Sequence, residues 1–210
     1  MNTRFNFWQN KYHGRINYRF TKYKRKYVIG VLIGRADAFH GNRNPNERIY
    51  MKSWGNFDQH IAHFEALIKL ILAHNMQVIL IGGKQELDIH DALSPEILSK
   101  CVDYVGKTSV AESIALASLC DVVVGIDTGM QHVSDAIGVK TVSLFGPTSP
   151  KQWGAYSDKA VFAQVDEPCR PCFGLWKGLT TQNINCKHRK CMNRITPEYV
   201  FELIIRQLNS

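Results

Sequence analysis

From residue 27 onward, short apolar runs alternate with longer amphipathic stretches, and this limits the folds open to the 210-residue chain. The runs are short enough for buried strands and cover residues 27–33, 76–81, 102–105, 121–126 and 141–145. The stretches between them predict helices at about 57–71, 84–100, 109–119 and 129–137. Strands that alternate with helices are typical of βαβ units. We therefore predict an α/β fold with about five parallel strands in a Rossmann-like sheet.

The alternation stops after Pro147, where a segment that carries four cysteines precedes a final helix. Thr196 followed by Pro197 predicts the start of that helix, because Thr suits the N-cap and Pro the first helical position. We expect a single Rossmann-like domain over residues 27–210, with a small cysteine finger at about 166–194. A flexible basic leader over residues 1–26 precedes it.

The net charge of +8 resides in this leader, which holds eight Lys and Arg residues and no carboxylate. The rest of the chain has 18 basic and 18 acidic side chains and is formally neutral. No apolar run approaches the roughly 20 residues of a membrane span, and the leader lacks the continuous apolar stretch of a secretory signal. These features exclude a transmembrane helix and favour a cytoplasmic location, where metal binding by a cysteine cluster is favoured over disulfides.

In a parallel sheet of this type, ligands bind at the carboxyl ends of the strands. Asp127, Thr128 and Gly129 follow the run 121–126 and open a helix whose N–H groups suit an anion such as a diphosphate. As an alternative, Asp127 or Thr128 simply caps that helix. His132, a little further on, is either a ligand contact or a hydrogen-bonded scaffold residue. A turn rich in hydroxyls, 145–150, lies at the same edge of the sheet.

Three more candidates face the same crevice. Lys52 ends a long polar loop, 34–53, at the entrance to the first helix. Glu86 follows two glycines and suits a ribose, or else it is a first-turn carboxylate favoured by the helix dipole. Thr108 precedes Ser109, which with Glu112 three residues later forms a capping-box pattern. The glycine-rich fingerprints of dinucleotide dehydrogenases and P-loop NTPases are missing from the sequence, which disfavours both classes.

The cysteine segment has a spacing typical of a tetrahedral thiolate site. Two cysteines stand three positions apart, thirteen residues follow, and two more stand five apart: Cys169, Cys172, Cys186 and Cys191. We expect structural zinc or iron on these four, with His188 able to replace one ligand. The alternatives are free cysteines or a disulfide pair. Cys101 and Cys120 lie in apolar runs and are expected to be buried.

The order and spacing of these motifs resemble glycosyltransferase family 9, the heptosyltransferases, which have GT-B architecture. The resemblance covers about residues 27–208 and is to the C-terminal, donor-binding half of that fold. The motifs that carry it are Lys52-x-Trp54, the Gly82-Gly83 turn, Gly106-x-Thr108-Ser109, residues 127–132 and residues 136–148. The four cysteines are similar to an iron-binding finger in the branch that modifies autotransporter proteins.

This resemblance implies a glycosyltransferase of inverting type that takes a nucleotide-activated sugar, most often ADP-heptose, without a catalytic metal ion. It implies that Lys52 contacts the donor phosphates, Glu86 the ribose and Thr108 the base. Asp127 would bind sugar hydroxyls, with Thr128, Gly129 and His132 around the diphosphate and sugar. The acceptor implied is the lipopolysaccharide core or a protein, at the inner membrane.

The family's catalytic Asp base lies in an N-terminal domain, and no residue of this chain matches it, so the catalytic residue is unknown here. We expect a fragment, a truncated gene product or half of a split enzyme, which binds donor but transfers little sugar alone. Its partner would be a separate N-terminal half, and the leader would meet a membrane surface or an acidic partner.

Two alternatives from other functional classes remain. A nucleic-acid-binding module would use the basic leader and the metal finger. It leaves the α/β body without a role, and the cysteine spacing lacks the two His ligands and recognition helix of a DNA-reading finger, so we expect no nucleic-acid partner. A non-catalytic sugar-nucleotide-binding subunit is the other alternative.

Overall fold

The structure is a computed structural model, and it describes residues 27–34, 54–172, 186 and 188–210. Across these residues one sheet contains six strands, all parallel, in the order β3-β2-β1-β4-β5-β6. The strands are β1 (Val28–Leu32), β2 (Gln77–Ile81), β3 (Val102–Asp103), β4 (Val122–Ile126), β5 (Lys140–Leu144) and β6 (Ala160–Ala163). This confirms the predicted α/β fold with a Rossmann-like parallel sheet.

The strand order places a topological switch point between β1 and β4. From β1 the chain moves outward to β2 and β3, then returns to pair β4 with the other side of β1. Leu32, the last residue of β1, pairs with Ile81 on one side and with Gly125 on the other. The loops that leave β1 and β4 therefore diverge at the carboxyl edge of the sheet and open a crevice there.

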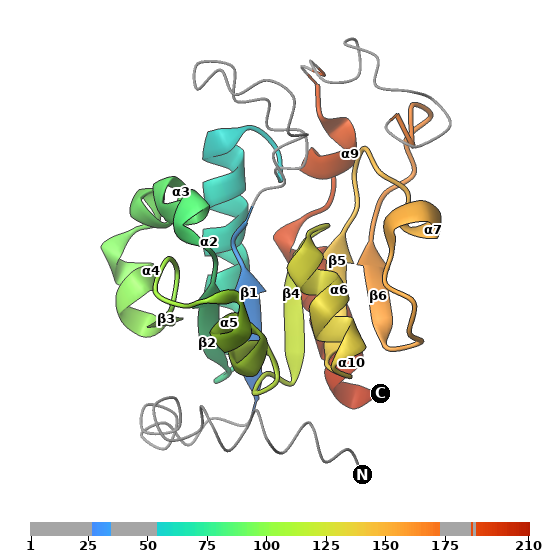
Figure 1. The fold of residues 1–210 in the computed structure, drawn as a ribbon. Helices are drawn as coiled ribbons and strands as arrows, with labels where there is room; N and C mark the ends of the chain where they lie inside the picture. Colours follow the sequence, from blue (N-terminus) through green and yellow to red (C-terminus); the bar gives the residue numbers. More distant parts are fainter. Residues whose placement is uncertain (1–26, 35–53, 173–185, 187) are drawn as a thin grey trace.

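Helices cover both faces of the sheet, with α5 and α6 in front of it and α2 and α10 behind it in Figure 1. Val31, Leu80 and Val124 pack toward α2 and α10, whereas Ile79, Ile81 and Val123 pack toward α5. Because successive side chains point to opposite faces, strands covered on both sides need the continuous apolar runs seen in the sequence. The helices are α2 (Phe57–Ala73), η1 (Lys84–Glu86), α3 (Leu87–Ala92), α4 (Pro95–Lys100), α5 (Val110–Ala117), α6 (Gly129–Ala136), α7 (Pro150–Trp153), α9 (Lys190–Asn193) and α10 (Pro197–Asn209).

Two sequence-based predictions of the elements were wrong. The sixth strand, β6, was not predicted, because its apolar run is only four residues long and the helix before it, α7 (Pro150–Trp153), is too short to show helical periodicity. The single helix predicted over 84–100 is instead η1, α3 and α4. Leu93 and Ser94 are extended, and Pro95 begins α4, since a residue before proline avoids the helical region.

The predicted helix starts are confirmed. Ser109 and Glu112 form the capping box of α5, and Thr196 caps α10 by accepting from the Tyr199 N–H at 3.2 Å. Within the described ranges no helix has the length and apolar character needed to cross a bilayer.

Candidate functional site

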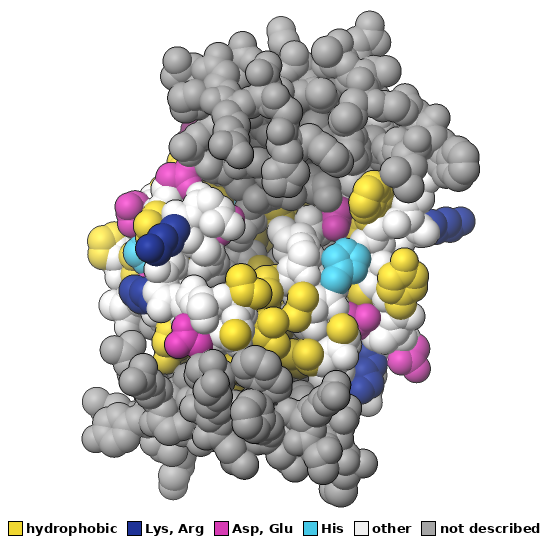
Figure 2. Space-filling model, viewed as in Figure 1, with side chains coloured by type: hydrophobic (Ala, Val, Ile, Leu, Met, Phe, Trp, Pro, Cys, Tyr) yellow, Lys and Arg dark blue, Asp and Glu magenta, His cyan; other side chains and the backbone are white. Residues whose placement is uncertain are grey.

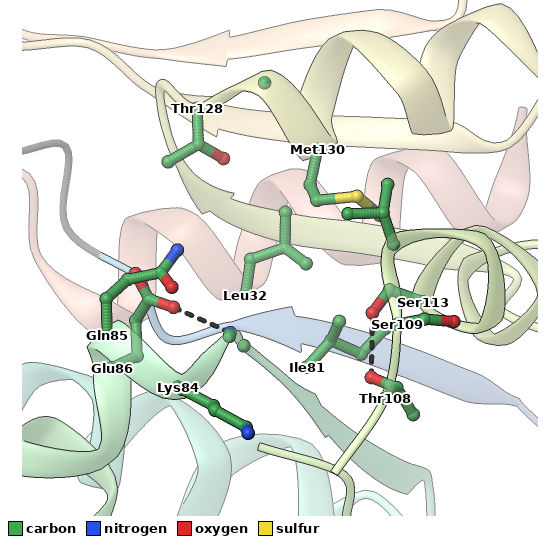
Figure 3. Close-up of a pocket in the computed structure, with 15 residues that line it drawn as sticks. Leu32, Ile81, Lys84, Gln85, Glu86, Thr108, Ser109, Ser113, Thr128 and Met130 are labelled. Atoms are coloured by element: carbon green, nitrogen blue, oxygen red, sulfur yellow. Dashed lines mark hydrogen bonds between the residues drawn. The ribbon is translucent and has the colours of Figure 1, made fainter. Parts of the chain in front are cut away.

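A pocket of about 820 Å³ lies at the carboxyl ends of β1, β2 and β4, at the switch point of the sheet (Figure 3). Its volume is within the range of small-molecule and cofactor sites. Three groups of residues approach it from different sides: Lys84 to Glu86, Thr108 to Ser113, and Thr128 to Met130. The ends of β1 and β2 supply its apolar part. The full lining is Leu32, Gly34, Ile81, Gly82, Gly83, Lys84, Gln85, Glu86, Thr108, Ser109, Val110, Ser113, Thr128, Gly129 and Met130.

The start of α6 forms one wall of this pocket. Thr128 is the N-cap residue by position, but its side chain makes no capping hydrogen bond. Its hydroxyl oxygen is buried and has no hydrogen-bond partner among the residues that the structure describes. A Cβ added at Gly129 would meet nothing within 4 Å. Thr128 therefore occupies the cap position without a side-chain capping bond, and the wall has room for a ligand at a helix N-terminus, where anions bind well.

Asp127 lies one residue earlier and is 5% exposed. Its Oδ2 accepts a hydrogen bond of 3.0 Å from the hydroxyl of Thr148, which is 1% exposed. This bond joins the loop after β4 to the turn after β5, so the two loops that the sequence placed at one edge do meet. Asp127 is not the N-cap of α6, and it does not line the pocket described above.

Glu86 forms part of the opposite wall and is 7% exposed. Its Oε2 accepts from the Gly83 N–H at 2.6 Å, drawn as a dashed line in Figure 3, and so closes the cap of η1. Glu86 is thus a first-turn carboxylate of η1, as the alternative interpretation has it, and it lines the pocket as well.

The third wall is the start of α5. The hydroxyls of Thr108 and Ser113 lie 2.8 Å apart, while Ser109 accepts from the Glu112 N–H at 3.3 Å. Val110 is 73% exposed, and Figure 2 shows apolar side chains gathered on this face of the molecule, over α5 and α6. The wall therefore offers hydroxyls beside apolar surface, as a ring system with polar edges requires.

Four of the predicted site residues line the pocket: Glu86, Thr108, Thr128 and Gly129. His132 lies further along α6 and is half-buried. Lys52 lies outside the described residues. Sequence reasoning did not single out Lys84, Gln85, Val110, Ser113 or Met130, although Ser113 could have been found because it stands four residues after Ser109 on one helix face.

The cysteines occupy different environments. None of the six forms a disulfide, and Cys120 and Cys191 are buried, Cys101, Cys172 and Cys186 partly buried, and Cys169 exposed. Burial of both Cys101 and Cys120 was predicted; it is complete only for Cys120, because Cys101 ends α4 beside the edge strand β3.

One cysteine of the predicted finger, Cys191, is affected by the other three. Burial raises the pKa of the Cys191 thiol to about 11, and the thiols of Cys172, Cys169 and Cys186 contribute to this rise, while Arg170 opposes it. The Sγ of Cys186 accepts from the Arg189 N–H at 3.4 Å. No three or more His, Cys, Asp or Glu side chains of the described chain form a metal-binding group, and the four-cysteine metal site stays a prediction.

Comparisons with known proteins point to one family. The model of glycosyltransferase family 9 (heptosyltransferase) matches residues 51–180. Lipooligosaccharide heptosyltransferase 2 of Haemophilus influenzae is 30% identical over 120 residues, which are 55% of this chain and 33% of that protein.

Solved structures share the fold at low sequence identity. The structure of the Escherichia coli ADP-heptose lps heptosyltransferase II gives a TM-score of 0.61 at 22% identity, covering 100% of this chain and 52% of that one. The iron-containing dodecameric glycosyltransferase TibC from enterotoxigenic Escherichia coli gives 0.60 at 15% identity, covering 88% and 45%. The chain thus spans about half the length, or less, of these proteins.

Proposed function

The chain belongs to glycosyltransferase family 9, the heptosyltransferases, and on that premise we propose that its pocket binds the nucleotide-sugar donor ADP-heptose. The observation that carries this proposal is the pocket itself, which sits at the switch point of a parallel sheet and meets the start of α6. There the space beside the Gly129 backbone is empty of described protein atoms, and the Thr128 hydroxyl has no hydrogen-bond partner among the described residues.

Each part of the donor is assigned to one region of the pocket, in the order base, ribose, diphosphate and sugar. The base lies against Leu32 and Ile81 with Thr108 at its polar edge, and the ribose hydroxyls meet Glu86. The diphosphate lies on the first turn of α6, between Thr128 and Gly129. The heptose then extends toward Asp127 and His132, and Lys52 contacts the phosphates. The name of the Escherichia coli structure supports ADP-heptose as the donor.

Inverting transfer of the sugar would explain why the start of α6 and Lys52 lie beside the diphosphate in this proposal. The acceptor hydroxyl gives its proton to a base and attacks the anomeric carbon, while the bond from that carbon to the diphosphate oxygen breaks and ADP departs. Negative charge grows on the departing diphosphate. A helix N-terminus and Lys52 stabilise that charge most when it is fully developed, which lowers the barrier without a divalent cation. The base would come from a second, N-terminal half, as in the family.

The acceptor we propose is the lipopolysaccharide core or a protein, modified by an enzyme peripheral to the inner membrane on the cytoplasmic side. The name of the Haemophilus influenzae relative supports a lipopolysaccharide-type acceptor, and the eight cations of the leader suit an anionic membrane surface.

A thermal-shift panel tests the nucleotide. ADP-, UDP- and GDP-sugars and a short DNA duplex are each added to the chain. At a hundredfold excess over the dissociation constant we expect ADP-heptose to raise the melting temperature by roughly 5 °C or more, because ligand binding adds its free energy to folding. A larger shift with a UDP- or GDP-sugar would contradict the choice of ADP. A shift with the duplex alone would replace the whole proposal by the nucleic-acid module.

For the cysteine segment we also propose structural zinc or iron on Cys169, Cys172, Cys186 and Cys191. The support is chemical: four thiols suit both ions, and the charges of Cys172, Cys169 and Cys186 contribute to the raised pKa of Cys191. The role is structural, because four protein ligands leave no position open for catalysis.

Substitution of one ligand tests this metal. Cys172→Ser should lower the metal content, measured by elemental analysis, and the melting temperature together. Cys101→Ser, outside the segment, is the control and should keep the metal. Metal-free wild-type chain that folds with full stability would refute the site.

A further inference from the structure

The turn after β5 is held by the arginine between two of the cysteines. Arg170 donates from Nε to the carbonyl oxygen of Gly146 at 2.6 Å, and from Nη2 to the carbonyl oxygen of Thr148 at 3.4 Å. The same guanidinium donates from Nη1 to the Val165 carbonyl and from Nη2 to Gln164 Oε1 at 3.1 Å. One planar group thus fixes the turn to the segment that carries Cys169 and Cys172.

Helix α9, which carries Cys191, supports the turn from another direction. A Cβ added at Gly146 would overlap the Sδ of Met192 and would lie 3.3 Å from the Sγ of Cys191. Both of these residues are in α9 and are buried. The turn at Gly146 is therefore packed against α9 while its carbonyl is held by Arg170, and it has little freedom to shift.

Thr148 transmits this constraint to Asp127. Its main-chain oxygen is the second oxygen of this turn that Arg170 holds, after that of Gly146, and its hydroxyl donates to Asp127 Oδ2 at 3.0 Å. Both residues are almost fully buried, so the bond is shielded from water. A hydrogen bond from a fixed hydroxyl selects one orientation of a carboxylate, and a shielded bond to a charged group is stronger than an exposed one.

We infer that Arg170 and Thr148 are positioning residues for the donor's sugar, acting through the orientation of Asp127. The inference rests on the proposed function, since it assumes that the Asp127 carboxylate binds sugar hydroxyls. It gives the cysteine segment a part in donor recognition, because Arg170 belongs to that segment. Neither residue touches the nucleotide pocket, so ADP alone should not detect their loss.

Calorimetric titration of ADP and of ADP-heptose into the 210-residue chain tests this. The quantity measured is the ratio of the two dissociation constants, which reports the contribution of the sugar. In Thr148→Val and in Arg170→Lys that contribution should fall about tenfold, as expected for losing one hydrogen bond to a charged group. The affinity for ADP should stay within about twofold of wild type, the usual scatter for an independent site.

Two further variants separate positioning from general damage. Thr148→Ser keeps the hydroxyl and should restore the wild-type ratio. In the double variant Arg170→Lys/Thr148→Val the ratio of the two dissociation constants should fall no further than in either single variant. The reason is that both changes interrupt the same series of contacts from Arg170 through Thr148 to Asp127. Ser149→Ala is the matched control, since that neighbouring hydroxyl caps α7 and should leave the ratio unchanged.

The possible failures are distinguishable. If wild type binds ADP-heptose better than ADP and Thr148→Val keeps that preference, the positioning role is wrong while the proposed function stands. Equal losses for ADP and ADP-heptose would show a purely structural role and also overturn it. If wild type binds ADP and ADP-heptose with equal affinity, Asp127 does not bind the sugar, and the positioning role is overturned with it. Wild type that binds neither ligand would overturn the proposed function and this inference with it.

Discussion

At the residue scale, the start of α6 combines two features that rarely occur together. The Gly129 backbone has open space beside it, and the Thr128 hydroxyl is buried with no partner among the residues described. Buried hydroxyls are usually satisfied, and an unsatisfied one calls for an explanation. A diphosphate on the helix N-terminus would supply the missing acceptor.

Gly129→Ala is expected to weaken donor binding without harming the fold. The new methyl group meets no protein atom, and alanine favours a helix over glycine by about 1 kcal/mol, so stability should be equal or higher. The methyl group would occupy the path of the diphosphate, and we expect ADP affinity to fall about tenfold, close to 1.4 kcal/mol. Calorimetry and urea unfolding measure the two quantities.

Gly125→Ala is the contrasting control. There a Cβ would lie 2.7 Å from Leu32 Cβ and 2.8 Å from the Leu32 carbonyl oxygen, so the sheet must shift. Overpacking of this kind costs about 1–3 kcal/mol of stability. If Gly129→Ala binds ADP as wild type does, the diphosphate lies elsewhere.

His63 gives stability a pH dependence. It lies half-buried on α2, with Nδ1 3.2 Å from the Trp54 carbonyl oxygen. Burial holds its pKa below the usual 6.5, although the Trp54 carbonyl and the charge of Glu198 oppose this. Since the unfolded chain binds the proton more readily, the free energy of unfolding should fall as pH drops below about 6.5.

Urea unfolding of wild type and His63→Gln at pH 7.5 and pH 5.5 measures this effect. The loss of stability on acidification should be smaller in the variant, because glutamine does not titrate in this range. An equal loss in both proteins would assign the effect to other groups.

Residue roles were predictable where the interacting partners are close in sequence. The Ser109 and Glu112 capping box follows from three-residue spacing and is confirmed. The bond between Thr148 and Asp127 joins residues 21 positions apart, and only the pairing of β4 with β5 brings them together. Local patterns carry no signal for such a contact, so the hydroxyls of the turn 145–150 were expected at the crevice without an assigned partner.

At the element scale, the stability of α5 depends strongly on its N-terminal cap, because the helix is short. Its eight residues are too few for an isolated helix to be stable, so the capping box and the packing of Leu116 must compensate. Ser109→Ala should lower the free energy of unfolding by about 1 kcal/mol, measured by urea titration.

Ser118→Ala at the other end of α5 is the matched control. The Ser118 hydroxyl donates back to the Ala115 carbonyl within the helix, and its loss should cost less than about 0.5 kcal/mol. Equal effects of the two substitutions would contradict a special role for the cap.

Elements were predictable where burial on both faces produced an apolar run. β1, β2 and β4 lie inside the sheet, and each appears in the sequence as such a run. β5 also lies inside it, although its sequence alternates polar and apolar residues. β6 lies at the edge, its first three residues are only partly buried, and its apolar run is only four residues long. The break before α4 follows from Pro95, a local signal in the sequence.

At the scale of the whole molecule, charge and site are separated along the chain. The eight excess cations are all in residues 1–26, whereas residues 27–210 have balanced charge. Attraction of a diphosphate to the pocket must then be local, from the start of α6 and from Lys52 in our proposal, since a neutral body provides no long-range steering. A parallel sheet with ligands at its carboxyl edge follows from the βαβ pattern, but the order of the strands and the depth and lining of the pocket do not.

The 210 residues by themselves should bind donor and transfer little sugar. In our proposal both carboxylates beside the donor have donor-binding roles, Glu86 toward the ribose and Asp127 toward the sugar hydroxyls, and each is also held by a hydrogen bond from the protein. Neither is assigned to the acceptor hydroxyl, and a positioned base contributes about 10²–10⁴ to the rate. We therefore expect acceptor-dependent release of ADP from ADP-heptose to stay at least about a hundredfold below that of a complete heptosyltransferase.

The assay pairs this release with calorimetry on the same preparation, so that a poorly folded sample is recognised by its failure to bind ADP-heptose. Robust turnover would show that a base does lie within these residues. Glu86→Gln and Asp127→Asn would then identify it, because loss of a base lowers the turnover number at saturating donor, whereas loss of a donor contact chiefly raises the donor concentration that is needed. Binding without turnover, together with turnover once an N-terminal half is supplied, is the result that we expect if the base lies outside these residues.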